Sequence, residues 1–443
     1  MRAAAACAQH VMRTAAACAL RCVRAAAACA RHALVVPVLL LSWSLRLLFY
    51  LGAEGGAHAV CVFIPRFFLL ACSLVPAAPY LLAALFSKRA TLYVKYAAHR
   101  RADYDVVLPA GGAPRAIVVL IPGGAWIIGH KYHTLSLVDA LLAARCAVVM
   151  TDLRMFPVAL ASAQAADVRD ALAAVARALP GWRADSRRVY ALAHSAGANL
   201  LALALLDAAE RGAGALGLRR ALLVSGAYDI AALRPHVIAR GLPAALLNAL
   251  FERDDARFSP TGVIARLAAG GRAAAAAPQR PAPPRAAGLA AALFRTSSTL
   301  LLATGRALAE AEGDLVIEAT APPAARAREG PSPACLSALP PLHVHHGVLD
   351  ATICVSQARA FVAALAAAGV AASLHEHAAD THTSLVLEGP LSGECAVVEA
   401  LLAAVAADEA ADGAAAAATP PRARRAAPLS RWYAHCVRRI NPF

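Results

Sequence analysis

The chain has 443 residues, enough for one large α/β domain with additional segments. Its formal net charge of +15 would suggest nucleic-acid binding if that charge lay on a folded face. The excess is instead at the two ends, because residues 1–101 hold twelve Lys and Arg against the single acid Glu54, and residues 420–443 hold six Arg and no acid. Nucleic-acid binding is therefore disfavoured, and a membrane surface or a targeting signal explains the basic ends better.

The N-terminal part of the chain has the composition of a membrane-associated segment. Residues 1–32 form a basic tail rich in Ala, Arg and Cys, and residues 33–86 contain two strongly apolar runs, 33–51 and 67–86. Each run is near the roughly 20 residues that a helix needs to cross a bilayer. Basic residues flank the pair on both outer sides, so the positive-inside rule places both flanks in the cytosol. A re-entrant or interfacial hairpin is an alternative, as is an organelle transit peptide over residues 1–32.

The eleven cysteines are irregularly spaced and show neither zinc-type pairs nor a small disulfide framework, which is typical of a reducing compartment. From residue 105 onward, short apolar runs alternate with helical patterns such as Val168, Leu172, Val175 and Leu179. This alternation predicts an α/β fold, a mostly parallel sheet with helices on both faces, over residues 87–408. The predicted strands cover residues 105–109, 115–121, 146–152, 188–193, 220–224, 341–346 and 371–377, after a linker at 87–101.

The strand at 115–121 ends in the run Pro122 to Gly129 (PGGAWIIG), which predicts an oxyanion-binding loop. Backbone N–H groups of such a glycine-rich loop hold the charge that develops on an ester oxygen during hydrolysis. We expect the donors to be Gly124, Ala125 and, further along the chain, Ala196. Esterases commonly have a His before the glycine pair, so Pro122 predicts a loop that lacks its usual support.

Ser195 lies in the run Val189 to Gly197 (VYALAHSAG), where an apolar strand turns directly into a helix over 198–208. This pattern is the nucleophile elbow of the α/β-hydrolases, with Ala193 at the position of the usual first Gly. The elbow holds its Ser in a strained backbone conformation, which only small residues two positions before and after it tolerate. The sequence therefore predicts Ser195 as a nucleophile.

Two later loops supply the partners that a serine nucleophile needs. Asp350 follows the strand at 341–346 and His382 follows the strand at 371–377, so the three residues occur in the order Ser, acid, His that this fold uses. The imidazole takes the proton of the serine, and the carboxylate fixes its tautomer and stabilises the imidazolium. Asp229 is a rival acid, but it lies one strand too early and helix capping or loop hydrogen bonding explains it better.

The remaining segments surround this site. Residues 231–258 predict a helical cap over it, rich in Leu and Ala, that would give an apolar group a pocket. A low-complexity insertion covers 268–333, and a disordered basic tail covers 409–443. Among possible substrate-binding residues, Trp126 would line the pocket or belong to the core, and Arg240 would meet a substrate carboxylate or a neighbouring acid. Asp152 and Arg154 are predicted to form a structural ion pair at a strand end.

Four histidines alternate on the last two predicted strands: His343, His345, His375 and His377. They lie near Asp380 and His382, which suggests a metal site, but no closed four-ligand set and no cysteine accompany them. We therefore expect no metal at this site and no cofactor for the enzyme.

Six runs of the chain together resemble the isoprenylcysteine methylesterases, membrane-bound serine hydrolases of the α/β-hydrolase superfamily. The resemblance covers roughly residues 86–267 and 340–405, and it implies hydrolysis of the C-terminal methyl ester on a prenylated cysteine. It also implies prenylated protein C-termini as partners and a location in the endoplasmic reticulum or Golgi membrane, with the hydrolase domain facing the cytosol. The runs are 122–129, 152–157 (DLRMFP), 194–198 (HSAGA), 225–228 (SGAY), 240–242 (RGL) and 381–383 (THT).

Three functions fit these observations. The first is the prenylcysteine methylesterase, acting through an acyl-enzyme on Ser195. The second is a broader carboxylesterase or lipase that uses the same site on membrane-derived esters. The third is a hydrolase fold that has lost catalysis and serves as a membrane-tethered binding protein, for which Pro122 is the best support.

Overall fold

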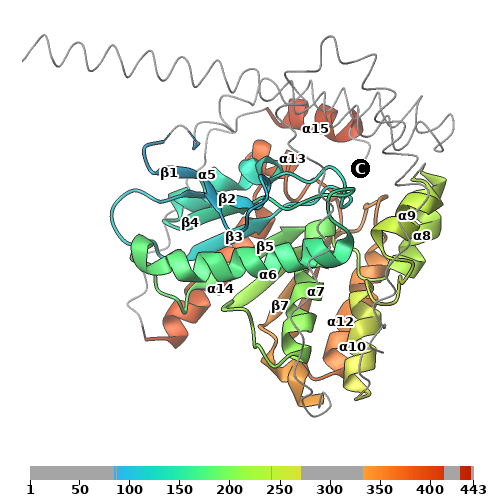
Figure 1. The fold of residues 1–443 in the computed structure, drawn as a ribbon. Helices are drawn as coiled ribbons and strands as arrows, with labels where there is room; N and C mark the ends of the chain where they lie inside the picture. Colours follow the sequence, from blue (N-terminus) through green and yellow to red (C-terminus); the bar gives the residue numbers. More distant parts are fainter. Residues whose placement is uncertain (1–83, 86, 241, 271–332, 414–429, 441–443) are drawn as a thin grey trace, which may run out of the picture.

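The computed structural model describes residues 84–85, 87–240, 242–270, 333–413 and 430–440. At its centre lies an eight-stranded sheet with the order β1-β2-β4-β3-β5-β6-β7-β8 (Figure 1). Strands β3 to β8 run parallel, while β1 and β2 form an antiparallel edge. The strands are β1 (Ala90–Lys95), β2 (Asp103–Val107), β3 (Ile117–Ile121), β4 (Ala147–Thr151), β5 (Val189–His194), β6 (Arg220–Val224), β7 (Leu342–Gly347) and β8 (Ala372–His377).

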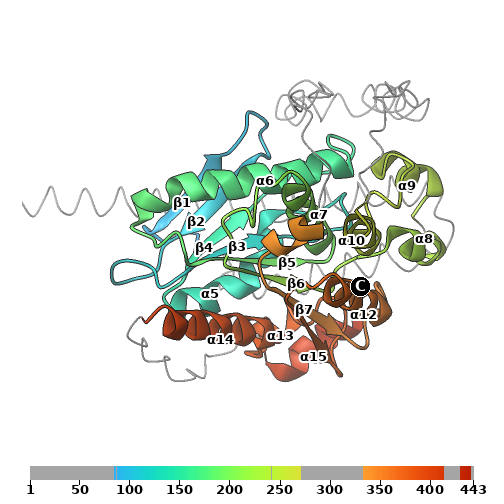
Figure 2. The ribbon, with the colours of Figure 1, turned by 90° about the horizontal axis from the view of Figure 1, so that it is seen from below.

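Helices cover both faces of the sheet because the side chains of each buried strand alternate between two apolar cores. Val119 and Ala191 pack in the core shared with α6, α7, α10 and α12, whereas Val118 and Leu192 pack in the core shared with α5 and α14. Figure 2 shows α6 and α7 on one side of the sheet and α5 and α14 on the other. These helices are α5 (Leu135–Ala143), α6 (Ala161–Ala178), α7 (Ala196–Glu210), α10 (Pro260–Ala268), α12 (Val355–Ala367) and α14 (Ala396–Ala411).

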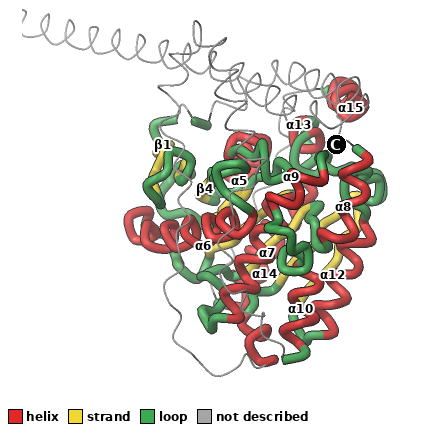
Figure 3. The backbone as a smooth tube through the Cα atoms, turned by 45° about the vertical axis from the view of Figure 1, so that its right-hand side comes forward, coloured by secondary structure: helices red, strands yellow, loops and turns green. Residues whose placement is uncertain are grey.

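The remaining α-helices gather around the carboxyl ends of the parallel strands. Helices α8, α9, α13 and α15 lie toward the same end of the molecule in Figure 3. Since parallel α/β sheets bind their ligands at this edge, these helices surround the expected site. They are α8 (Ile230–Ala239), α9 (Ala244–Leu250), α13 (Glu388–Leu391) and α15 (Arg431–Ile440), and the short 3₁₀ helices are η3 (Lys131–Thr134), η4 (Leu179–Trp182) and η5 (Pro333–Ala338).

The structure confirms the mostly parallel sheet, with each predicted strand within two residues of the observed one at its start. The helical spacing of Val168, Leu172 and Val175 is confirmed too, since all three are buried against the sheet in α6. Helices α8 and α9 lie within the segment predicted as a helical cap.

Two predictions were wrong. The linker at 87–101 contains β1, whose side chains alternate between half-buried and exposed as an edge strand requires. The tail predicted to be disordered from residue 409 contains the end of α14 and, later, α15, whose Ala434 and Val437 are buried.

The predicted membrane segments lie outside the described residues, except for Ala84 and Leu85, which belong to the core shared with α5 and α14. Within the described part of the chain, no helix combines the length and hydropathy of a membrane span. Most of the insertion predicted at 268–333 also lies outside the described residues.

Candidate active site

The turn between β5 and α7 has the conformation that the sequence predicted for a nucleophile elbow. Ser195 adopts φ +54° and ψ −121°, a backbone conformation that residues other than Gly rarely adopt. A Cβ at Gly197 would lie 2.4 Å from the carbonyl oxygen of Pro122, so α7 can approach the oxyanion loop only because that position is Gly. Gly123 is packed just as closely, because a Cβ added at this position would lie 2.9 Å from the Cβ of Ser195.

Three loops bring Ser195, His382 and Asp350 together at the carboxyl ends of β5, β8 and β7. The Oγ of Ser195 lies 2.8 Å from Nε2 of His382, and Nδ1 of His382 lies 2.7 Å from Oδ2 of Asp350. The side chains of His382 and Asp350 are almost fully buried. An imidazole that donates from Nδ1 to a carboxylate presents a free lone pair on Nε2, which is the atom facing the serine hydroxyl.

The carboxylate of Asp350 is held in its charged form by several donors. Its Oδ1 accepts from the backbone N–H groups of Thr352 and Ile353, each at 2.8 Å, and Nε2 of His346 lies 3.2 Å from Oδ2. Burial alone would raise the pKa of Asp350, but the charge of His382 and the hydrogen bonds from His346, His382 and Ile353 outweigh it and hold the pKa well below its usual value. A carboxylate that stays ionised can stabilise a positive His382.

His194 is a neighbour of the site that the sequence reasoning missed. Its Nε2 donates to the carbonyl oxygen of His382 at 2.9 Å, and the two imidazole rings lie 5.0 Å apart. Burial, followed by the nearby charge of His382, lowers the pKa of His194 to about 3. The ring is therefore neutral near pH 7 and orients the His382 loop without adding a second positive charge. The sequence did offer one sign that His194 lies at the site, namely its position directly before Ser195.

The run after β3 forms a loop in front of Ser195. Gly124 has φ +132°, and Ala125 and Trp126 have φ +49° and +63°, so three successive residues lie in the left-handed half of conformational space. A backbone with successive positive φ angles can direct neighbouring N–H groups to the same side, whereas the N–H groups of a strand alternate between its two sides. Within the described residues, the N–H groups of Gly124, Ala125 and Ala196 have no hydrogen-bond acceptor, which leaves all three available to an oxyanion.

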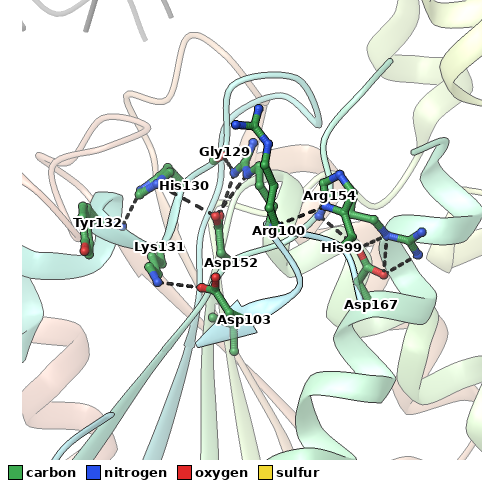
Figure 4. Close-up of polar contacts among 12 residues, drawn as sticks. His99, Arg100, Asp103, Gly129, His130, Lys131, Tyr132, Asp152, Arg154 and Asp167 are labelled. Carbon is green, nitrogen blue, oxygen red and sulfur yellow. Dashed lines mark hydrogen bonds and ion pairs between the residues drawn. The ribbon is translucent and has the colours of Figure 1, made fainter. Parts of the chain in front are cut away.

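A buried polar network supports this loop from behind (Figure 4). Arg101 donates to the carbonyl oxygen of Gly129 and forms an ion pair with Asp152 at 2.6 Å. Lys131, which is 1% exposed, lies between Asp103 at 2.6 Å and Asp105 at 2.7 Å. Burial would lower the pKa of Lys131, but the two carboxylates raise it, so the ammonium stays charged.

This network corrects two expectations. The loop was expected to lack support because Pro122 replaces a His, yet Arg101 and Lys131 hold its far end, and a hydrogen bond links His133 to the backbone of Gly123. Asp152 and Arg154 were expected to pair with each other. Instead Asp152 pairs with Arg101, and Arg154 pairs with Asp167 on α6 at 2.6 Å, because the two side chains leave the strand end in different directions (Figure 4).

Trp126 both belongs to the core and lines a pocket. It is buried, its Nε1 donates to Asn199 on α7 at 3.3 Å, and its ring packs edge-on against Phe251 at 5.0 Å. It also lines an apolar pocket between the oxyanion loop and the cap. The other lining residues include Ala125, Ile230, Leu233, Val237 and Leu247.

Arg240 lies beside the loop that carries Asp350, and the charge of that acid acts on its guanidinium. Its Nη1 donates to the carbonyl oxygen of Ala351 at 2.8 Å and to the hydroxyl of Thr352 at 3.0 Å, and so ties the cap to the Asp350 loop. Asp229, the rival acid, accepts from the N–H of Ala232 and caps α8, as predicted.

The histidines of β7 and β8 lie on the face of the sheet that α14 covers. His345 stacks on His375 with ring centroids 4.5 Å apart, and its Nδ1 lies 3.1 Å from Nε2 of His377. In the part of the chain that the structure describes, no group of three or more His, Cys, Asp or Glu side chains is arranged to hold a metal ion.

Comparison with known proteins identifies relatives of this chain. A family model described as BD-FAE matches residues 104–216. The isoprenylcysteine alpha-carbonyl methylesterase ICME of Arabidopsis thaliana is 25% identical over 428 residues, which span 93% of this chain and 83% of that protein. A rice protein named "Probable isoprenylcysteine alpha-carbonyl methylesterase ICME" is 25% identical over 369 residues, 81% of this chain and 73% of that protein.

Solved esterases are similar as well. A hyperthermophilic esterase from Pyrobaculum calidifontis has a TM-score of 0.48 at 17% identity, covering 77% of this chain and 89% of that one. Esterase 2 of Thermogutta terrifontis has a TM-score of 0.45 at 16% identity, covering 74% and 96%. The curated relatives confirm the resemblance drawn from the sequence: the chain is a carboxylic ester hydrolase of the α/β-hydrolase superfamily, similar over most of its length to proteins named isoprenylcysteine methylesterases.

Proposed function

We propose that this enzyme hydrolyses the methyl ester of C-terminal isoprenylcysteine, with Ser195, His382 and Asp350 as its catalytic triad. The observation that carries the proposal is the unbroken hydrogen-bond chain from the Ser195 hydroxyl through His382 to Asp350. The names of the curated relatives support the choice of ester. The apolar pocket between Trp126 and the cap would take part of the prenyl chain.

The reaction follows from the positions of these groups. Ser195 Oγ attacks the ester carbonyl carbon while Nε2 of His382 takes the hydroxyl proton. The carbonyl oxygen becomes an oxyanion and accepts from the N–H groups of Gly124, Ala125 and Ala196. His382 then returns the proton to the departing methoxide, and methanol leaves an acyl-enzyme. A water molecule, deprotonated by the same imidazole, attacks the acyl carbon. As the bond between this carbon and Ser195 Oγ breaks, Nε2 of His382 returns the proton to Oγ, and the carboxylate leaves.

The test compares wild type with Ser195→Ala in detergent, following methanol release from farnesylcysteine methyl ester and hydrolysis of a short-chain nitrophenyl ester. Removing the nucleophile should lower turnover by on the order of 10⁶. Ser225→Ala is a matched control, because Ser225 is a buried serine at the end of the neighbouring strand whose Oγ has no partner within the described residues.

The pattern of activities separates the three functions. Serine-dependent hydrolysis that favours the prenylated ester supports the proposal. Serine-dependent hydrolysis of the simple ester alone would assign a broader carboxylesterase. Equal rates for wild type and Ser195→Ala would mean that the fold serves binding.

We also propose that the enzyme resides in the endoplasmic reticulum or Golgi membrane with its hydrolase domain in the cytosol. The support is the pair of apolar runs at 33–51 and 67–86 and the basic residues on both outer sides. Protease treatment of sealed microsomes should remove a C-terminal epitope, whereas an epitope that survives until detergent is added would reverse this orientation.

A further inference from the structure

Large apolar side chains are exposed on segments that adjoin the loops carrying Asp350 and His382. Among the described residues, six large hydrophobic side chains are exposed, and four of them form what we call the rim surface: Ile238, Val348, Leu349 and Trp432. Trp432 is 74% exposed and Leu349 is 57% exposed. Single exposed apolar residues are ordinary, but a connected group of them marks an interaction surface.

Hydrogen bonds connect the segments that carry the rim surface. The N–H of Leu349 donates to the carbonyl oxygen of Asp380 at 3.0 Å, which joins the loops after β7 and β8. Arg438 of α15 donates to the carbonyl oxygen of Ala379 at 3.3 Å. On the other side, His236 of α8 donates to the carbonyl oxygen of Ala351 at 2.7 Å. The rim surface is therefore one continuous band of loops and helices, and Asp350 and His382 lie in its loops.

Helix α15 gives this band a basic, amphipathic edge. Its Ala434 and Val437 are buried against the domain, whereas Trp432, Arg431, His435 and Arg439 are exposed. The acids close to it are already paired, Glu394 with Arg431 at 3.7 Å and Asp380 with Arg438 at 3.7 Å. The three arginines of α15 outnumber these two acids, and the Arg431–Glu394 pair is so exposed that it is weak, so Arg431 can exchange Glu394 for another anion. An excess of cations beside an exposed Trp matches the headgroup region of an anionic bilayer, where indole rings and guanidinium groups both find favourable partners.

We propose that the rim surface rests on an anionic lipid bilayer, with Trp432 inserted at the headgroup level and Arg431 and Arg439 against lipid phosphates. In this pose the loops that carry Asp350 and His382 lie directly at the membrane. The contact belongs to the folded domain itself and does not depend on which ester the enzyme hydrolyses or on the N-terminal apolar runs.

The experiment uses the full chain reconstituted in phosphatidylcholine vesicles whose acyl chains are brominated, with and without phosphatidylserine. Subtracting the fluorescence of Trp432→Phe from that of wild type isolates the signal of Trp432 from the other three tryptophans. We expect bromine to quench this signal and phosphatidylserine to strengthen the quenching. The double variant Arg431→Gln and Arg439→Gln should lose the strengthening while keeping the fold, because it introduces no like charges.

Trp182 provides the matched control. It is half-buried against Tyr104 at the opposite edge of the sheet, so the signal isolated with Trp182→Phe should not be quenched. A Trp432 signal that bromine leaves unchanged would overturn the proposal. So would a Trp432 signal that shifts to the blue with protein concentration in detergent alone, since a second copy of the chain would then cover the surface. Esterase activity enters neither readout, so failure here is distinct from failure of the proposed function.

Discussion

At the scale of single residues, the proposed triad requires Asp350 to hold His382 in the tautomer that can act as a base. Replacing Asp350 by Asn keeps an oxygen for the N–H groups of Thr352 and Ile353, which donate to Oδ1 at 2.8 Å. The new amide nitrogen, however, would face Nδ1 of His382 and favour the tautomer that carries its proton on Nε2. That tautomer cannot accept the proton of Ser195. We expect kcat for ester hydrolysis to fall by about 10⁴ with little change in stability.

Asp229→Asn is the matched control for this prediction, because Asp229 is the other acid that the sequence offered for the triad. Asn caps a helix as well as Asp does, so α8 should keep its N-terminal hydrogen bond and kcat should stay within a few-fold of wild type. If Asp229→Asn were the inactive variant and Asp350→Asn the active one, the triad assignment would be wrong.

The sequence predicted residue types at the site better than residue partners. That Ser195, Asp350 and His382 lie together could be predicted, because chain order and strand ends restrict where each can lie. The partners of Asp152 and Arg154 could not, since Arg101 and Asp167 approach them from segments far away in the chain or from another element. His194 was missed for the same reason: its importance comes from the carbonyl oxygen of His382, 188 residues later.

At the scale of elements, the short helix η3 acts as the anchor of the oxyanion loop. Its Lys131 is buried between two carboxylates of β2, so removing the ammonium leaves Asp103 and Asp105 without their shared cation. Breaking a buried ion pair from one side typically costs about 3–5 kcal/mol. We expect Lys131→Met to lower the free energy of unfolding by roughly that amount, and to lower kcat more than it raises KM, because the loop that would bind the oxyanion loses its support.

Lys95→Met tests whether burial of the ion pair is the reason for the loss of stability expected in Lys131→Met. Lys95 also pairs with Asp103, at 2.9 Å, but its side chain is 48% exposed. An exposed pair contributes at most about 1 kcal/mol, so urea unfolding of Lys95→Met should resemble that of wild type. Equal losses of stability in the two variants would contradict the anchoring role of Lys131.

Elements that the sequence failed to predict share a weak hydropathy signal. The strand β1 is an edge strand with a Lys and a Thr on its exposed side, and it follows a basic segment that resembles a linker. The buried face of α15 includes Ala434 and Val437, which add little contrast to an Ala- and Arg-rich tail. The central strands were predictable because both of their faces are covered, so they appear as continuous apolar runs.

At the scale of the whole molecule, α14 joins the amino ends of the central strands through charged groups. Glu409 binds Arg115 before β3 at 2.7 Å and Arg188 before β5 at 3.4 Å, and Asp408 binds Arg220 of β6 at 2.5 Å. These ion pairs hold α14 against the amino ends of the strands, at the end of the sheet opposite the candidate active site. The two edges therefore have separate roles, one for stability and one for chemistry, as is common in α/β folds.

The histidines between α14 and the sheet make the stability of the whole domain depend on pH. His345 is 2% exposed and faces His375 and His377 of β8, His343 of its own strand, and the Arg220–Asp408 pair. Burial, followed by the charges of the other histidines, lowers the pKa of His345 to about 3. A lowered pKa means that the folded state holds the neutral form, while the unfolded chain takes up a proton near pH 6.5. His345 therefore destabilises the fold progressively as the pH falls below about 6.5.

We expect the free energy of unfolding to fall between about pH 6.5 and pH 4, by up to roughly 1.4 kcal/mol per pH unit for each such histidine. His130, His133 and His194, whose pKa values burial lowers to about 3, 4 and 3, act in the same direction. His345→Leu should reduce the slope of this fall in urea unfolding followed by tryptophan fluorescence, whatever it does to the stability at pH 7. His435→Gln, at an exposed position on α15, should leave the slope unchanged. If His345→Leu kept the same slope as wild type, His345 would have to take up its proton in the folded protein, and the conclusion that it is neutral there would be wrong.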